Sequence, residues 1–495
     1  LVAEQLRNEL GETLPPESLA DVHVRIALAR RLSGGSADEF VPSLLDALEL
    51  ITDHDEATRF LIAYLPDIST NKRVLEAIER SLRMQEKERD LADILELRSV
   101  LISGRSLKKC LNELLSLYRS TLSDPVKAFR TEGRLYRLDL EDEELRGILE
   151  ISAESTGLWS ELVKLYRTLA PDADVAIRRT LLMRTSDIEA GYLGDPKAAA
   201  AALEAVVSDD PGDVEVLHRL ADIYRGQSSQ DDLARTLKRL AELVGDDESR
   251  RVLLELAQVL QRGLDRREDA LAILVEARER WVKDVDVLTS LRGLLLDLDR
   301  SQEAEEVIRD LASCLEVDER NRYLVEAGRL SYSRLDQPGI ALDRVREVFE
   351  TVSTHQGAVE LAEAVFATQE DFQVEAAGIL APALRELDVP ERLIPVLEIL
   401  EDNEGDRVAK SALHLELADI YLGPVDDSEL AELHMRAAVT QMPGDLVLRH
   451  RLLELSRMRD KLREHVLFLE GLLEEEGQEE FQVSLVHEAA TILVE

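Results

Sequence analysis

The sequence repeats itself every 71 residues, and this period restricts the fold more than any other feature. An alanine occupies one place in five successive units: Ala57, Ala128, Ala199, Ala270 and Ala341. A large apolar residue occupies a second place: Phe40, Leu111, Leu182, Leu253 and Leu324. A fixed period of about 20 to 50 residues, or a multiple of it, is typical of proteins that stack one structural unit on the next. We therefore expect a stack of repeats and not a set of separate globular domains.

Each 71-residue unit has the pattern of four helices. In the unit around Leu253 we predict helices over Asp246–Gly263, Arg267–Arg280, Asp284–Leu298 and Ser301–Cys314. Apolar residues recur in them at helical spacing, and the breaks carry residues that cap or stop helices. Leu, Ala, Glu and Arg dominate the chain, all of them strong helix formers, and only 4% of the residues are aromatic. The sequence therefore predicts an all-α protein with two helical hairpins in each unit.

An alanine tract, Ala198–Ala202, lies inside this pattern. Ala199 is the member that recurs in every unit, and we expect it where the second helix of a hairpin presses on the first, because only a small side chain permits that approach. The next three alanines correspond to Leu271, Ala272 and Ile273 one unit later. We interpret Ala200–Ala202 as good helix formers without a packing role.

Two stretches carry a hairpin motif. In LHRLADIY and HLELADIY the motif residues are Leu217, Leu220, Ala221 and Tyr224, and His414, Leu417, Ala418 and Tyr421. The second block of the motif is formed by Ala199, Leu203, Val206 and Pro211, and again by Ala431, Met435, Ala438 and Pro443. These residues resemble the tetratricopeptide repeat (TPR), a helix–turn–helix of about 34 residues with the pattern W-x2-L-G-x2-Y, A-x3-F-x2-A and P. The resemblance covers residues 38–495 and implies a TPR-like α-solenoid, a right-handed superhelix of stacked helical hairpins.

The period also predicts how the chain divides. After Ala341 the matching alanine is Ala431, so one additional helix is inserted between them. We predict four regions: an N-terminal cap or partial repeat (1–36), a TPR-like solenoid of about five four-helix units (37–388), an inserted extra helix (389–405) and C-terminal TPR-like hairpins (406–495).

Charge restricts the partners. The chain has 101 acidic and 60 basic residues and a formal net charge of −41. A field of this sign repels nucleic acids and anionic membrane surfaces. We therefore predict protein or peptide partners and no nucleic acid, with salt-sensitive binding of any basic partner. Membrane insertion is not expected, because no apolar run approaches the roughly 18 residues of a transmembrane helix.

Composition bears on the source and the compartment. Arginine far outnumbers lysine and alanine is abundant, which is typical of a high-GC bacterial protein. Cys110 and Cys314 lie far apart and form no disulfide framework, in agreement with a reducing compartment. We predict a cytoplasmic protein. The chain begins at Leu1, so a removed signal peptide is an alternative that the sequence leaves open.

No motif for catalysis is present. The HExxH, GxGxxG, P-loop and GxSxG patterns are absent. The nine histidines are scattered, without the spacing of metal ligands. We therefore expect no catalytic residue, no cofactor and no metal, and we do not predict an enzyme.

Basic residues recur near the starts of the long first helices. Lys108, Arg179 and Arg250 share one frame of the period, and Lys109, Arg251 and Arg322 share the adjacent frame. Two interpretations are open. The residues form a cationic ladder for acidic groups of a peptide, or they form salt bridges between repeats. We favour salt bridges, because the surrounding sequence is rich in Asp and Glu.

The TPR resemblance implies that the first helices of the hairpins line a concave groove. The candidate partner-binding residues on that face are His218, Asp222, Arg225, Arg251, Gln258, Arg262, Arg322, Arg329 and Tyr332. They form a mixed polar set. The Lys and Asn with which chaperone-binding members of the family clamp a terminal carboxylate are absent at the matching positions.

A solenoid buries each repeat only against its neighbours and leaves a long open surface. Such a surface suits extended peptides or whole proteins. Our first hypothesis is a non-enzymatic interaction scaffold that binds a peptide or protein partner within a larger bacterial assembly. The alternatives are a recruitment or regulatory arm of a larger multidomain enzyme, and a self-assembling structural subunit, that is, a homo-oligomer.

Overall fold

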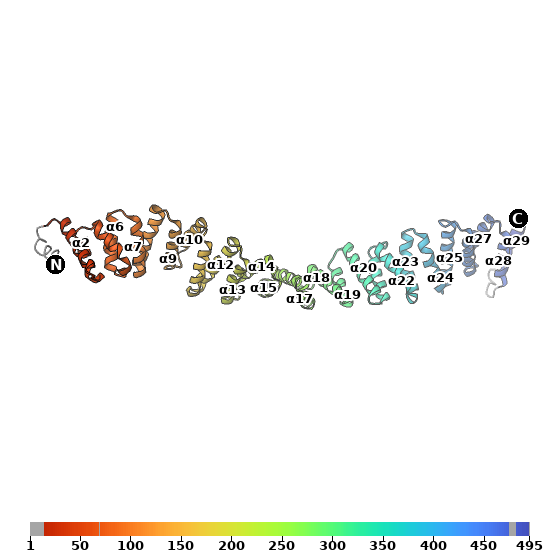
Figure 1. The fold of residues 1–495 in the computed structure, drawn as a ribbon. Helices are drawn as coiled ribbons and strands as arrows, with labels where there is room; N and C mark the ends of the chain where they lie inside the picture. The colour runs from red at the N-terminus through yellow and green to blue at the C-terminus, as the bar shows by residue number, and fades with distance from the viewer. Residues whose placement is uncertain (1–13, 69, 475–481, 495) are drawn as a thin grey trace. The chain divides into compact units, whose positions relative to one another are not determined.

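The computed structural model describes residues 14–68, 70–474 and 482–494. Within these ranges the chain consists of helices joined by short turns, and no strand is present (Figure 1). It forms two compact units, Leu1–Thr236 and Leu237–Glu495. The boundary falls inside helix α15 (Gln230–Leu243). The prediction of an all-α fold is confirmed.

In the first unit, helices that are adjacent in sequence pack against each other. They are α2 (Pro16–Leu32), α3 (Ala37–Leu50), α4 (Asp55–Ala63), α5 (Leu65–Ile68), α6 (Lys72–Met84), α7 (Glu88–Leu101), α8 (Gly104–Ser116) with the π-turn η1 (Leu117–Thr121), α9 (Pro125–Tyr136), α10 (Glu143–Thr156), α11 (Trp159–Leu169) with the 3-10 turn η2 (Ala170–Asp172), α12 (Val175–Gly191), α13 (Pro196–Asp209) and α14 (Val214–Gln227).

The second unit continues the same alternation. Its helices are α16 (Asp246–Gln258) with the π-turn η3 (Val259–Gly263), α17 (Arg267–Arg280), α18 (Val285–Asp297), α19 (Ser301–Ser313), α20 (Val317–Ser333), α21 (Pro338–Phe349), α22 (Gln356–Thr368), the 3-10 turn η4 (Glu370–Phe372), α23 (Gln373–Glu386), α24 (Pro390–Asn403), α25 (Arg407–Leu422), α26 (Ser428–Gln441), α27 (Leu446–Met458), α28 (Leu462–Glu474) and α29 (Gln482–Val494). The four helices predicted around Leu253 correspond to α16 to α19, except that the first one ends in a π-turn.

We call the first helix of each hairpin the A helix and the second the B helix. The A helices used below are α3, α6, α8, α10, α12, α14, α16, α18, α20, α22 and α25, and the B helix follows each of them. Within each unit a B helix packs against its own A helix and against the A helix of the next hairpin, as α13 does against α12 and α14 and α17 does against α16 and α18. Both units are therefore stacks of hairpins.

The recurring alanine lies on the B helix, where it is buried. Ala199 in α13 and Ala270 in α17 are both 0% exposed. Ala201 is exposed, as expected of a residue that only favours the helix. The interpretation of Ala200 and Ala202 as residues without a packing role is wrong, because both are buried. The reason is that α13 has an A helix on each side, so more of its surface is covered.

The turn between the A and B helices of the longer hairpins repeats as well. One residue in it has a left-handed backbone conformation: Ser123, Gly194, Asp265 and Asp336 have φ values of 49°, 66°, 53° and 52°. The next N–H donates to the carbonyl six residues earlier, as Asp195 does to Glu189 at 2.8 Å. This bond closes the A helix. The carboxylate of Asp195 then accepts the N–H of Ala198 at 3.0 Å and caps the B helix.

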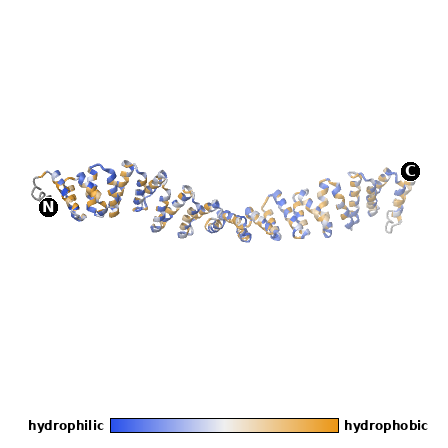
Figure 2. Cartoon of the chain, in the orientation of Figure 1, coloured by the Kyte–Doolittle hydropathy of each residue, from blue (hydrophilic) through white to orange (hydrophobic). Residues whose placement is uncertain are grey.

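Each unit buries its apolar side chains between neighbouring hairpins. One cluster of buried residues runs from Ala20 to Leu135 in the first unit, and another runs from Ala312 to Ile492 in the second. Figure 2 shows hydrophobic and hydrophilic residues interleaved along the helices. A single hairpin is too thin to bury its own apolar face, so the core extends along the stack from one hairpin to the next.

Helix α24 interrupts the alternation of A and B helices. It lies between α23 and α25 and contacts both. A helix is therefore present where the sequence predicted an additional one. The boundaries of the four predicted regions stay predictions, and residues 1–13, 475–481 and 495 of the terminal regions lie outside the described residues.

Two histidines connect α24 to the hairpin that follows it. His414 in α25 is 6% exposed, and its Nδ1 lies 3.3 Å from Nδ1 of His434 in α26. Its Nε2 lies 3.2 Å from Oε1 of Glu401 in α24. Lys410 reaches the same carboxylate oxygen at 3.2 Å. When Nε2 of His414 donates to Glu401, Nδ1 of His414 must accept, so His434 is the donor between the two rings.

Burial favours the neutral form of both imidazoles. It lowers the pKa of His414, an effect that Glu401 opposes and that His434 and Lys410 increase. It also lowers the pKa of His434, against the attraction of Glu401 and Glu398. The contact between α24 and the α25–α26 hairpin is thus built for uncharged histidines.

We expect Ala199→Leu and Ala270→Leu each to destabilise the protein by about 1–3 kcal/mol, because the larger side chain overpacks a buried contact between helices. Ala201→Leu is the matched control in the same helix, and it should cost much less. Urea denaturation followed by circular dichroism measures the three free energies of unfolding. Equal values for the three variants would contradict the assignment of Ala199 to the helix contact.

We expect the second unit to lose stability as the pH falls below about 6.5. His414 and His434 have lower pKa values folded than unfolded, so in this window the unfolded chain binds more protons. Thermal melts between about pH 7.5 and 5.5 measure the effect. A His414→Gln/His434→Gln double variant should lose part of this pH dependence, whereas His450→Gln, at an exposed histidine, should keep it. A double variant with the full pH dependence would show that other groups cause it.

Candidate functional site

The nine predicted groove residues all lie on A helices or their terminal turns, and they divide between the two units. The first unit holds His218, Asp222 and Arg225 on α14, and the second holds Arg251 and Gln258 on α16, Arg262 on η3, and Arg322, Arg329 and Tyr332 on α20. None of the nine is buried. Asp222 and Arg225 form an ion pair along α14. That the nine residues form one groove stays a prediction.

Three successive A helices of the second unit surround a recess of about 410 Å³. Its lining residues are Arg292 from α18, Arg322, Tyr323, Val325, Glu326 and Arg329 from α20, and His355 and Gly357 from the start of α22. A Cβ atom at Gly357 would lie 3.4 Å from both Val325 and the His355 ring, in van der Waals contact with both. The recess brings together two predicted groove residues, Arg322 and Arg329, but not Arg251, Gln258 or Arg262.

Two of the three arginines in the recess already hold a carboxylate. Nε of Arg292 lies 2.8 Å from Oε1 of Glu326, and its guanidinium lies 5.4 Å from the centre of the Tyr323 ring. Arg329 pairs with Glu360 of α22 at 3.0 Å. Arg322 is exposed and has no such partner among the residues that the structure describes. One uncompensated guanidinium therefore remains at the recess.

His355 supplies a second donor. It is the N-cap of α22, where its Nδ1 accepts the backbone N–H of Ala358 at 3.3 Å. A neutral imidazole that accepts at Nδ1 carries its proton on Nε2. That Nε2–H has no partner in the described part of the chain. The helix cap thus determines the tautomer and leaves an N–H available to a ligand.

Tyr332, also predicted for the groove, has a structural role. Its hydroxyl lies 2.7 Å from Oγ1 of Thr368 and 3.3 Å from the carbonyl oxygen of Ala364, both on α22. These bonds connect two A helices directly, and they use the polar end of the tyrosine.

The two frames of recurring basic residues behave differently. Arg179 on α12 pairs with Asp213 at 2.5 Å and with Glu215 at 2.7 Å at the start of α14. One unit later Arg250 repeats this contact with Asp284 at 2.8 Å and Asp286 at 3.1 Å, and Lys108 pairs with Asp139 at 3.3 Å. We call these contacts the bridge ladder. The interpretation of this frame as salt bridges between repeats is confirmed.

At Arg179 and Arg250 the bridge ladder uses the carboxylates that cap the next A helix, Asp213 and Asp284. Asp213 accepts the N–H of Val216 at 3.2 Å while it holds Arg179. The side-chain hydrogen bond from Arg179 holds the pKa of Asp213 below its ordinary value, and it does the same for Glu215. A cation at a helix N-terminus is unfavourable for its own helix, and these acidic partners offset that cost.

The bridge ladder ends at the recess. One unit after Arg250 and Asp284, the corresponding residues are Asn321 and His355. Asn321 bonds to Thr351 at 2.9 Å and makes no bridge to the cap of α22. The predicted site residues did not include His355, Arg292, Tyr323, Glu326 and Gly357. The change from aspartate to histidine at the capping place was a signal in the period that could have identified His355.

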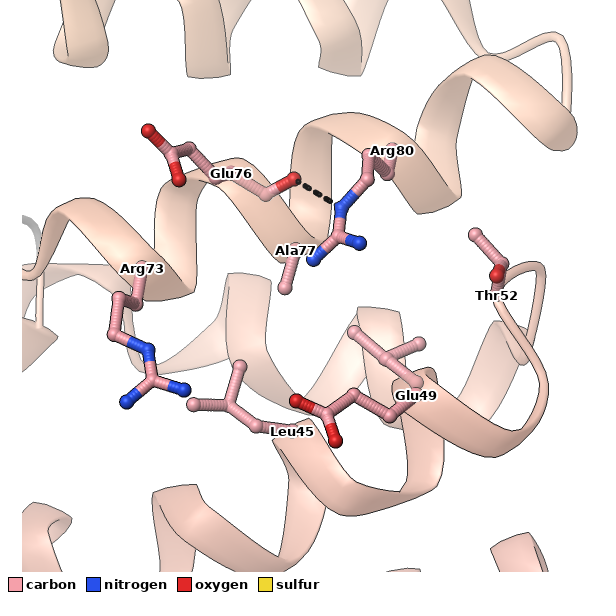
Figure 3. Close-up of a pocket in the computed structure, with 8 residues that line it drawn as sticks. Leu45, Glu49, Thr52, Arg73, Glu76, Ala77 and Arg80 are labelled. Atoms are coloured by element: carbon pink, nitrogen blue, oxygen red, sulfur yellow. Dashed lines mark hydrogen bonds between the residues drawn. The ribbon is translucent and has the colours of Figure 1, made fainter.

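A smaller recess of about 70 Å³ lies between the A helices α3 and α6 of the first unit. Figure 3 shows Glu49 and Leu45 of α3 opposite Arg73 and Ala77 of α6, with Arg80 bonded to the backbone carbonyl of Glu76 at 3.4 Å. This recess also lies between A helices, although it has room for little more than a side-chain tip.

The described residues contain no site of two further kinds. No group of three or more His, Cys, Asp or Glu in these ranges is arranged to hold a metal ion. None of the helices there has the length and apolar character needed to cross a membrane.

The repeated A and B helices, the small residue between them and the continuous core define the class of protein. Both units are TPR-like α-solenoids, as the motif residues implied. The right-handed superhelix and the single groove stay predictions.

Known proteins give limited further information. Neither a protein-family model nor a curated protein matches the chain. The chain is similar in structure to a Naa15/Naa10 complex bound to HypK-THB (14% identity, 92% of this chain and 69% of that chain, TM-score 0.26). It is also similar to the MamA protein, with 19% identity over 39% of this chain and 95% of that chain and a TM-score of 0.26. A third similar structure is a tetratricopeptide repeat protein from Parabacteroides merdae ATCC 43184, with 15% identity over 56% of this chain and 98% of that chain and a TM-score of 0.21. These values are low, so the class rests on the hairpins described above.

We expect Arg179→Gln to lower the free energy of unfolding by about 1 kcal/mol or less, because the pair that it removes is partly exposed to solvent. The loss should shrink in 1 M salt, where charges are screened beyond about 3 Å. Arg251→Gln is the matched control, since the hydrogen bond that Arg251 makes within the described residues is to the carbonyl of Asp247 on its own helix, at 3.3 Å. Urea denaturation at low and high salt tests this, and an equal loss for both variants would contradict the assignment of Arg179 to the bridge ladder.

Proposed function

We propose that this chain is a non-enzymatic protein–protein interaction scaffold that binds a peptide or protein partner on its A helices. The observation that carries this proposal is the recess between α18, α20 and α22. It combines apolar packing surface, at Tyr323 and Val325, with hydrogen-bond donors, at Arg322 and His355. Ligand sites of this mixed character suit a side chain of a partner together with its apolar neighbour.

The charge of the chain supports a protein partner. A net charge of −41 opposes a phosphate backbone. In the bridge ladder the basic residues hold carboxylates of the chain itself, so they form no continuous basic surface for nucleic acid. We further propose that the scaffold works within a larger assembly in the bacterial cytoplasm, as the arginine-rich composition and the two free cysteines suggest.

Site-specific photocrosslinking tests this function. A photoreactive amino acid is placed at Gln258 or Arg322 on A helices, and at the exposed Glu306 on the B helix α19 as the matched control. After irradiation in the native cells, we expect the same partner protein to be captured from both A-helix positions and not from Glu306. Equal capture from Glu306, or no capture from any position, would overturn the proposal.

A further inference from the structure

The recess lies between α20 and the next A helix, α22, where the bridge that Arg250 forms one unit earlier is missing. After α16, Arg250 fills the space before the next A helix by pairing with the capping aspartate Asp284. After α20, the corresponding residues are Asn321, which turns to Thr351, and His355. One unit earlier, a guanidinium and a carboxylate pair between the two A helices. Here the recess holds instead the guanidinium of Arg322, which has no carboxylate partner among the described residues, and the Nε2–H of His355.

The same chain shows what a histidine cap of this kind binds. His54 is the N-cap of α4, and its Nδ1 accepts the N–H of Ala57 at 3.3 Å, as His355 does from Ala358. Nε2 of His54 lies 3.1 Å from the carboxylate oxygen Oδ1 of Asp21. With Nδ1 occupied by the cap, the free donor of the ring thus meets a carboxylate. At His355 the chain itself supplies no such group among its described residues.

We propose that the recess binds the side-chain carboxylate of an Asp or Glu in the partner, between the guanidinium of Arg322 and the Nε2–H of His355. The apolar neighbour of that residue packs on Tyr323 and Val325. This inference deepens the proposed function and rests on it, since it names the chemistry that the scaffold recognises in its partner.

The charge of the recess favours a monoanion. Glu326 and Glu360 neutralise Arg292 and Arg329, and a neutral imidazole adds a donor without a charge, so a single positive charge remains. A carboxylate matches that charge, whereas a phosphorylated side chain with a charge near −2 leaves the excess uncompensated. The net charge of −41 repels a strongly acidic partner at long range. The recognised segment is therefore an acidic residue in a neutral or basic surrounding.

Affinity selection with the full chain tests the inference. The probes are three pools of peptides, each about 12 residues long, with random uncharged residues around a central Glu, Gln or phosphoserine. A charge-assisted pair of hydrogen bonds predicts retention of the Glu pool about tenfold above the Gln pool, and above the phosphoserine pool. Arg322→Gln and His355→Asn should each reduce the preference for Glu severalfold. Asparagine is itself a good N-cap, so the second variant keeps α22 and loses the imidazole donor.

Lys109→Gln is the matched control, because it changes the exposed basic residue at the same place of the period in another hairpin and does not line the recess. It should keep the full preference for Glu, and thermal melts should show all three variants folded. Equal retention of Glu and Gln, retention of no peptide, or an unchanged preference in Arg322→Gln would overturn the inference. Stronger retention of phosphoserine would overturn the choice of a carboxylate. If photocrosslinking captures a partner while Glu and Gln are retained equally, this inference fails and the proposed function stands.

Discussion

Close contact between the A and B helices at a small residue is the constraint on which the rest of the structure depends. Ala199 and Ala270 are fully buried, so a longer side chain at either place would overpack the contact between helices. Each hairpin then presents one apolar face to its predecessor and one to its successor. Stability in such a stack is approximately a sum over repeats and the interfaces between neighbours, so a fault at one alanine should weaken its own part of the stack most.

Polar contacts determine how one hairpin meets the next. Asp213 and Asp284 each perform two tasks, because the same carboxylate caps its own helix and holds an arginine of the preceding A helix. In a chain with so large an excess of acidic groups, this arrangement places positive charge where helix caps gather negative charge. Basic residues near helix N-termini, which are unfavourable within one helix, become favourable between hairpins.

A departure from the period is therefore informative. Where Asn321 and His355 replace the arginine and the aspartate, the bridge between hairpins is missing and the recess of about 410 Å³ is found. At α24 a single helix enters the series, and the uncharged pair of His414 and His434 connects it to its neighbours. At both places the contact that repeats between successive hairpins is absent. Both places carry histidines, whose protonation depends on the surrounding residues.

The sequence by itself determined the class of fold, because a stacked repeat needs the same small and large residues at the same places in every unit, and the 71-residue period shows them. It also determined the helix limits around Leu253 to within a residue, since aspartate, glycine and proline act locally at helix ends. Only the tertiary structure decided which basic residues form ion pairs with the next hairpin. Arg250 and Arg251 are adjacent in sequence, yet Arg250 pairs with Asp284 of the next hairpin, whereas Arg251 donates to a backbone carbonyl of its own helix. The recess likewise depends on Arg292, Arg322 and His355 from three separate A helices, and their proximity follows from the stacking of hairpins and not from any local pattern.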